Sequence, residues 1–448
     1  MRDWMHKHYA IVEYTLLLIS GIIFYVLLGD TWVSIETDSQ FYMNPNGREG
    51  VMPVYPAFLR LMRVIVGEEH YLDGAVIVQS VLAVFCTMVF VLVIKSHFTL
   101  RLWEELLLYV ACMLPFSIYL PESGITHQIM TEGLAYPLFY IYFSILLVFI
   151  LNKQYKWGIV LAVISLFMML IRSQLAILFV TTFAAFIYVI ICRIPDRRKA
   201  RRVTGACFGL AIVGGGLLIA GLRSQVINVS QFTTVLMIRG FYEADYEDRE
   251  LFDTPEMREI YERVYNAVDE KQYRYVYARQ DLYMWQDLLC DRITTIAYAE
   301  IAKYLDEYPG PGMNERKIVQ ELGSTILFRH FDRYLYHTVR LMLPGFIAAV
   351  FFQVDSVYLM CHFIALFLYL YALVGSILCL RHGADRKVSE FMMTVVGFIF
   401  ILVVTVNLVF FGMQRYVVYA MGIFYCAAYL LFRELIMLYI AKRGSLRK

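Results

Sequence analysis

Long uninterrupted apolar runs are the feature that most constrains how this 448-residue chain can fold. They recur in stretches of about 18 residues or more, the length that an α-helix needs to cross a bilayer. The composition agrees, with 60% hydrophobic and 17% charged residues, whereas globular chains are nearer half apolar and a quarter charged. We therefore predict an all-α polytopic membrane protein in contact with the lipid bilayer.

Ten apolar stretches are predicted to span the membrane: roughly 9–29, 72–94, 103–121, 130–151, 157–171, 173–192, 203–222, 356–380, 391–411 and 417–440. Short basic connectors such as "NKQYK" and "RIPDRRKARR" lie between alternate spans. The positive-inside rule places such connectors in the cytoplasm, so both termini are predicted to be cytoplasmic in an inner or plasma membrane. Residues 338–354 are also apolar, but a crossing there would invert the later loops. We predict an interfacial or re-entrant helix instead.

These connectors divide the chain into three predicted parts. Residues 1–222 form an N-terminal transmembrane module, whose first external loop covers 30–71. Residues 223–337 form a small extracytoplasmic helical domain, and 338–448 contain the interfacial helix and the last spans. Within the external domain, "DTPEMREIYERVYNAV" has Asp and Thr before Pro and Glu, followed by apolar residues three and four apart. That pattern predicts the start of a helix.

Candidate functional residues lie in connectors that this topology places on the outer face. Asp38 is in "IETDSQFY", ahead of an amphipathic stretch with prolines that would hold the loop along the membrane surface. Partial desolvation there would raise the pKa of the carboxyl toward that of a useful general base; a solvated loop acid is the alternative. Glu132 opens the fourth span, where an acid serves either in function or in stabilising the helix N-terminus. His127 precedes it without the spacing of a metal site.

Two arginines occupy outer turns between apolar segments. Arg172 lies in "LIRSQLA" and Arg415 in "QRYVVYA". Either side chain would suit an anionic phosphate near the membrane surface. The alternative is that each guanidinium snorkels to the interface without a ligand. Two such arginines on the same face as two acids favour the binding interpretation.

The order of these motifs resembles the GT-C superfamily of integral-membrane glycosyltransferases. The likeness is to bacterial members related to the protein O-mannosyltransferase and aminoarabinose-transferase branch. It rests on "TDSQFY", "MPVYPAFLRLM", "TEGLAYPLF", "LIRSQLA" and "QRYVVYA". The residues carried over are Asp38, Tyr42, Tyr55, Glu132, Arg172, Arg415 and Tyr416. The resemblance covers 1–192 and 391–440, and it implies a GT-C-type bundle with an interfacial first external loop.

The resemblance also implies an activity. A sugar would pass from a polyprenyl-phosphate or diphosphate donor to the hydroxyl of a glycan, lipid or protein acceptor outside the cytoplasm, with inversion. Asp38 would be the general base, and Glu132 would orient the acceptor or the sugar. Arg172 and Arg415 would balance charge on the leaving phosphate. No cofactor is implied with certainty, and because Ser39 stands where the family often has a second acid, a divalent metal ion stays an open alternative.

Other residues of the outer face are expected to bind substrate: Tyr42, Tyr55, Tyr416 and His127. The rival functions are a transporter or flippase of lipid-linked sugars and a non-catalytic factor in envelope-polysaccharide assembly. Transporters usually place ionisable groups near the bilayer midplane and show internal repeats, neither of which this sequence displays. It also has no Walker motif or nucleotide-binding glycine loop, and we expect no nucleic-acid partner.

Overall fold

A computed structural model gives the fold of the chain. It describes residues 9–27, 33–36, 38–44, 52–117, 124–193, 205, 209, 229–277, 282–309, 314–351, 358–409 and 414–445. The model is 87% helical and has no β-strand within those ranges, apart from an isolated bridge between Ser34 and Gln128. This confirms the predicted all-α class.

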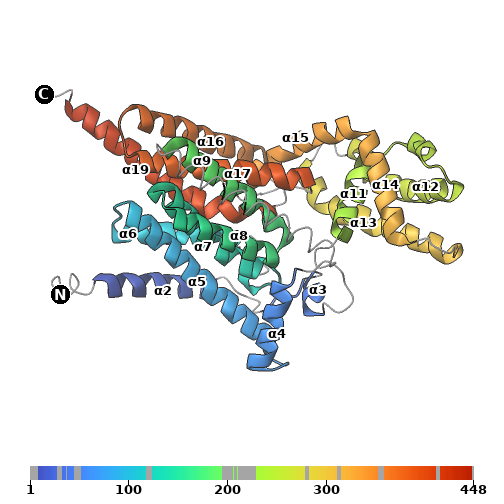
Figure 1. The fold of residues 1–448 in the computed structure, drawn as a ribbon, viewed down its shortest axis with the longest axis horizontal. Helices are drawn as coiled ribbons and strands as arrows, with labels where there is room; N and C mark the ends of the chain where they lie inside the picture. The colour runs from blue at the N-terminus through green and yellow to red at the C-terminus, as the bar shows by residue number, and fades with distance from the viewer. Residues whose placement is uncertain are drawn as a thin grey trace.

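Helices follow one another along the whole described chain (Figure 1). The first half contains α2 (Tyr9–Leu27), α3 (Ser39–Met43), α4 (Val54–Val66), α5 (Tyr71–His97), α6 (Leu102–Met113), η1 (Leu114–Ser117), η2 (Ile125–His127), α7 (Glu132–Asn152), α8 (Tyr155–Ile171), η3 (Ser173–Ala176) and α9 (Ile177–Arg193). The second half contains α11 (Val229–Glu243), η4 (Tyr246–Leu251), α12 (Pro255–Glu270), η5 (Tyr275–Tyr277), α13 (Leu282–Glu307), α14 (Glu315–Arg329), α15 (Phe331–Ala348), α16 (Tyr358–Arg381), α17 (Arg386–Val409), α18 (Gln414–Val417), η7 (Val418–Ala420) and α19 (Met421–Ser445).

Six helical segments are long and apolar enough to cross a membrane: Tyr71–His97, Glu132–Asn152, Ser173–Ile190, Leu359–Arg381, Arg386–Leu408 and Val418–Arg443. The helices α2 and α8 are apolar but shorter. The predicted span 103–121 corresponds to α6 and η1, and 203–222 lies outside the described residues apart from two isolated positions. The chain is therefore a polytopic helical membrane protein, and the total of ten spans stays a prediction.

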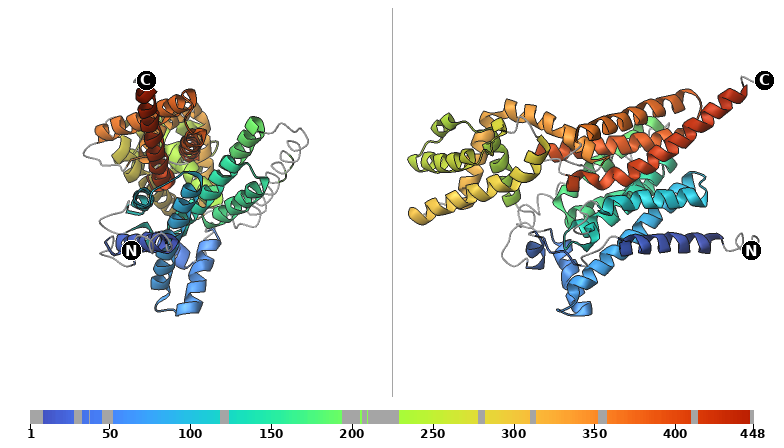
Figure 2. Two further views of the ribbon diagram at one scale, coloured as in Figure 1. Left: turned by 90° about the vertical axis from the view of Figure 1, so that its left-hand side faces the viewer. Right: turned by 180° about the vertical axis from the view of Figure 1, so that it is seen from behind.

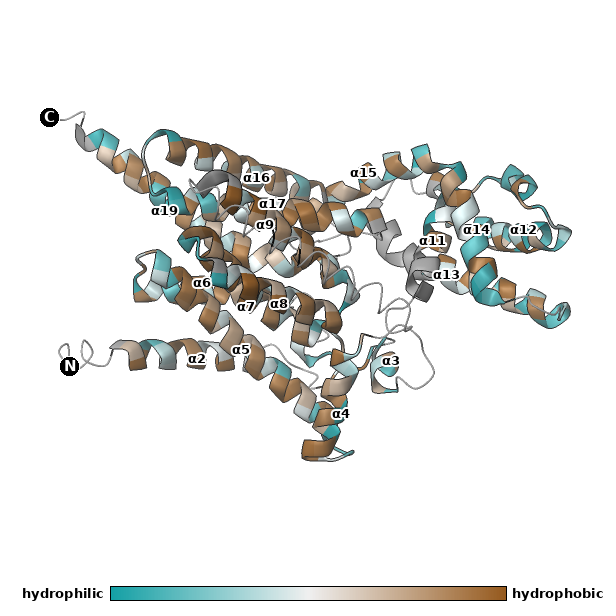
Figure 3. Ribbon diagram, viewed as in Figure 1, coloured by the Kyte–Doolittle hydropathy of each residue, from teal (hydrophilic) through white to brown (hydrophobic). Residues whose placement is uncertain are grey.

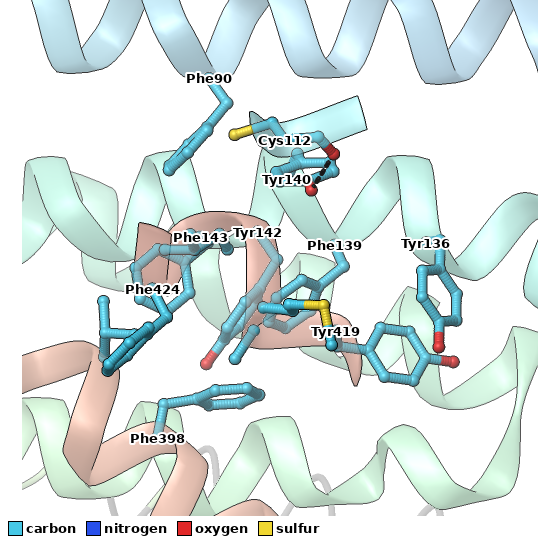
Figure 4. Close-up of a cluster of buried hydrophobic side chains, with 14 of the residues drawn as sticks. Phe90, Cys112, Tyr136, Phe139, Tyr140, Tyr142, Phe143, Phe398, Tyr419 and Phe424 are labelled. Carbon is cyan, nitrogen blue, oxygen red and sulfur yellow. Dashed lines mark hydrogen bonds between the residues drawn. The ribbon is translucent and has the colours of Figure 1, made fainter. Parts of the chain in front are cut away.

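The core of the bundle is built around α7. Of its apolar window 78% is buried, more than in any other candidate span, because neighbouring helices surround it. Aromatic side chains fill the contacts: Tyr136 stacks on Tyr419 of η7 with ring centroids 4.0 Å apart, and Phe139 lies 5.1 Å from Phe398 of α17 (Figure 4). Such aromatic pairs add about 0.5–1.5 kcal/mol each beyond the area that they bury.

The two ends of the bundle differ in what they carry. The helix α2 begins and α19 ends at one end, whereas α3, α4 and the segment α11–α14 lie toward the other (Figures 1 and 2). Hydrophobic residues dominate the bundle, and hydrophilic residues are concentrated in α12–α14 (Figure 3). The polar helical segment and the loop after α2 therefore lie toward the same end of the bundle, and the orientation of that end in the membrane stays a prediction.

The segment α11–α14 has a small core of its own. Its helix α12 starts as predicted, because Pro255 is its first residue and the Thr254 hydroxyl accepts from the Met257 N–H at 3.2 Å. The helices α11 and α14 cross closely where Gly240 faces Gly323, so that a Cβ on Gly323 would lie 2.5 Å from a backbone nitrogen of α11.

The helix α15 leads from this segment back to the bundle, where it packs against α16 and α17. It buries Tyr334 and Leu341 and exposes Leu335, Val339 and Leu343. An apolar stripe of that kind, beside a helix that enters the membrane, suits the predicted interfacial position. Among the described residues, α15 is not one of the helices that are long and apolar enough to span a membrane.

Candidate functional site

Backbone pairing joins the loop that follows α2 to the segment before α7. The Ser34 N–H donates to the His127 carbonyl at 2.9 Å, and the Ile129 N–H donates to the Ser34 carbonyl at 3.0 Å. These two bonds form the Ser34–Gln128 bridge. They hold Ser34 against the segment just before α7, although about 90 residues separate the two segments in the sequence.

An ion pair at the start of α7 is the centre of the site. The Glu132 carboxylate, 1% exposed, contacts the Arg172 guanidinium, whose side chain is 13% exposed. Burial lowers the pKa of Arg172, but Glu132 and neighbouring tyrosines together raise it by more, so the arginine stays charged. Thr131 is the N-cap residue of α7, but its side chain makes no capping hydrogen bond. Its hydroxyl donates to Glu132 at 3.0 Å and accepts from Arg172 at 3.4 Å.

The aromatic ring of Tyr416, in α18, contacts the arginine of this pair. Arg172 lies over the Tyr416 ring, with 5.1 Å between the guanidinium carbon and the ring centroid, within the range of a cation–π contact. The Gln174 side-chain amide donates to the Tyr416 carbonyl at 2.8 Å, so η3 and α18 are held together. Arg415 belongs to α18, but its side chain lies outside the described residues, and its role stays a prediction.

Tyr42 and Asp38 approach the ion pair from the first loop. Asp38 is the N-cap residue of α3, and Tyr42 follows one turn later. Burial raises the pKa of Tyr42 to about 12, with further rises from the Glu132 and Asp38 charges, while Arg172 and a hydrogen bond with Thr131 oppose them. A phenol with that pKa stays protonated near neutral pH, so Tyr42 can donate a hydrogen bond but is a poor base. Asp38 is the better candidate for that role.

Two further predicted substrate-binding residues, Tyr55 and His127, are buried. Tyr55 is fully buried and contacts Tyr42 edge to face, with ring centroids 5.3 Å apart. His127 is 1% exposed and its ring lies 5.9 Å from the Tyr25 ring of α2. Both side chains are buried in this structure, and direct contact of either with a substrate stays a prediction.

A metal site does not emerge from the described side chains. Across the described ranges, no group of three or more His, Cys, Asp or Glu residues could hold a metal ion. Glu36, the other acid of the first loop, accepts a hydrogen bond from the Ser34 hydroxyl at 3.0 Å. The described residues therefore offer no set of ligands for a divalent metal ion, and whether the protein requires one stays undecided.

The structure brings together five of the eight predicted site residues in one cluster, which we call the acid–arginine face: Asp38, Tyr42, Glu132, Arg172 and Tyr416. Sequence reasoning missed Gln79, which is fully buried in α5 and hydrogen-bonded to the segment before α7. A glutamine inside the apolar run "VIVQSVLAV" was the available signal, since polar residues within spans usually have a specific partner.

The chain matches no protein-family model, no curated protein and no solved structure. Inference about its function therefore rests on its own residues and on the acid–arginine face that they form.

Proposed function

We propose that the chain is a membrane-embedded glycosyltransferase. It transfers a sugar from a polyprenyl-phosphate or diphosphate donor to an acceptor hydroxyl on the extracytoplasmic face. The observation that supports this proposal is the acid–arginine face, in which separate parts of the chain place a carboxylate, an ion pair and two tyrosines together at one end of an apolar bundle. A lipid-borne donor would reach such a site from within the bilayer.

The proposed reaction is a single displacement at the anomeric carbon. Asp38 takes the proton from the acceptor hydroxyl, whose oxygen attacks the anomeric carbon from the side opposite the phosphate. The bond between that carbon and the phosphate oxygen breaks, and the lipid phosphate leaves with the bonding pair. The configuration of the sugar is inverted.

Arg172 is the described cation that would meet the growing negative charge on the phosphate. Its guanidinium is held by Glu132, Thr131 and the Tyr416 ring, so little reorganisation is needed when charge develops. Arg415 would add a second cation from α18. The Tyr42 phenol, kept protonated by burial, would donate a hydrogen bond to the sugar or the phosphate.

A transporter or flippase of lipid-linked sugars is the second candidate, and one observation favours it. Lys95 of α5 contacts Glu13 of α2 at 2.5 Å and Glu105 of α6 at 3.0 Å, and both carboxylates are buried. Ionisable residues buried between apolar helices commonly mark transport pathways. This cluster joins helix ends rather than helix centres, because Lys95 is the third residue from the end of α5.

Lipid analysis of cells that lack the chain tests the proposal. We expect a polyprenyl-phosphate sugar to accumulate with its sugar on the outer face, where periodate oxidises it in intact cells. Loss of a flippase would instead leave the lipid-linked sugar on the inner face, protected from periodate. Accumulation of no lipid-linked sugar would refute both candidates, and re-expression of the wild-type chain is the control.

A further inference from the structure

Gln79 occupies a position that connects three parts of the proposed site. It lies in the N-terminal half of α5 and is fully buried. Its side-chain amide donates to the Thr126 carbonyl at 2.7 Å and to the Gln128 carbonyl at 3.2 Å, and its oxygen accepts from the Tyr55 hydroxyl at 2.9 Å. Both ends of the amide are therefore engaged, with the loop before α7 on one side and α4 on the other.

The carbonyls that Gln79 binds flank the one that binds the first loop. Thr126 and Gln128 face Gln79, while the carbonyl of His127 between them accepts from Ser34. The segment 124–129, which contains the short helix η2, is thus held on two sides. On one side lies α5, and on the other lies the loop that carries Asp38.

The packing around the amide is tight enough to fix its orientation. A Cβ on Gly133, one residue after Glu132, would lie 2.4–2.6 Å from the three terminal atoms of the Gln79 side chain. Only glycine leaves room for the amide there. Any side chain at position 133 would therefore have to displace the Gln79 amide from its hydrogen-bonded position.

We propose that Gln79 is a positioning residue for the acid–arginine face. It holds segment 124–129 and, through Tyr55, the ring of Tyr42 in the places that the site requires. The functional part of this inference rests on the proposed glycosyltransferase activity, whereas the positioning part does not. Leucine or methionine would satisfy the apolar surroundings equally well, but neither could bind two carbonyls and a phenol.

Hydrogen–deuterium exchange of the full chain in lipid nanodiscs tests the positioning. Gln79→Met should speed exchange of the Ser34 and Ile129 amides roughly tenfold, because all three hydrogen bonds of the Gln79 side-chain amide are lost. Peptides covering 33–44 and 124–131 would report this change. Gly133→Ala should act in the same direction, since it displaces the amide without removing it.

Thr87→Val is the matched control. Thr87 is also fully buried in α5, and its hydroxyl has no hydrogen-bond partner among the described residues, so its replacement should leave exchange in both peptides unchanged. Unchanged exchange in Gln79→Met, or an equal increase throughout the chain including α12, would overturn the proposal. The first result would mean that Gln79 positions nothing, and the second that it serves general stability only.

A transfer assay separates this inference from the proposed function. With a polyprenyl-phosphate sugar as donor, Gln79→Met should lower kcat roughly 10- to 100-fold, as small misplacements of reacting groups do, and should leave the donor KM within about twofold. Absence of transfer by the wild-type chain would refute the proposed function while leaving the exchange result valid. Wild-type kcat in a variant with raised exchange would refute the role of Gln79 in positioning the reacting groups.

Discussion

Replacement of either member of the Glu132–Arg172 pair should destabilise the protein, and the two losses should differ. Arg172→Met removes the cation from a carboxylate that is 1% exposed. Glu132→Gln removes the anion from a guanidinium that is 13% exposed and also contacts Thr131 and the Tyr416 ring. The burial of the two side chains therefore makes loss of the arginine the more damaging change.

The magnitudes follow from what each variant leaves behind. A buried charge deprived of its partner costs about 3–5 kcal/mol, which is the loss that we expect for Arg172→Met. Glu132→Gln should cost about 1–2 kcal/mol, because the amide oxygen still accepts a hydrogen bond from Arg172. In the double variant no charge is left buried, so its stability should return to within about 1 kcal/mol of the wild type.

Thermal unfolding in lipid nanodiscs would measure this order. A fluorogenic maleimide reports unfolding, because it reacts with thiols that are buried in the folded chain: Cys86, Cys112, Cys361, Cys379 and Cys426. The Tm should fall in the order wild type, double variant, Glu132→Gln, Arg172→Met. Additive losses in the double variant, or a wild-type Tm for Arg172→Met, would refute the interpretation of the contact as a buried ion pair.

Two further predictions concern parts of the chain away from the site. Gly323→Ala should separate α11 from α14, since its Cβ would meet backbone atoms at 2.5–2.8 Å, and limited proteolysis should cut this segment faster. Gly397→Ala, where no atom in the described part of the chain lies within 4 Å of the added carbon, should leave the rate of cleavage in α11–α14 unchanged. Lys95→Met leaves Glu13 and Glu105 buried without their shared cation and should cost about 3–5 kcal/mol. A wild-type Tm for Lys95→Met in the maleimide assay would contradict this predicted loss of stability.

The sequence predicts the class of fold and the approximate ends of most spans, because apolar runs of membrane length have few other structures available to them. It also predicts that Asp38, Glu132 and Arg172 lie on one face, since each follows or precedes a span at the same end of the bundle. This much needs only hydropathy and the distribution of Lys and Arg.

The details of the site depend on packing that no local pattern reveals. Glu132 pairs with Arg172 because α7 and α8 are neighbours, and Tyr55 is buried because α4 packs against α5. The bridge between Ser34 and Gln128 joins segments far apart in the sequence, and neither segment has a strand pattern. The resemblance to GT-C enzymes indicated the residues but not these contacts.

The central claim is that Asp38 is the base for transfer of a lipid-linked sugar, and one comparison tests it most directly. The purified chain in proteoliposomes is given the lipid-linked sugar that accumulates in its absence, together with an acceptor extract. Glu36→Gln is the matched control, since its amide oxygen can still accept from the Ser34 hydroxyl. We predict transfer with inversion by the wild type and by Glu36→Gln, and none by Asp38→Asn. Full transfer by Asp38→Asn would contradict the account.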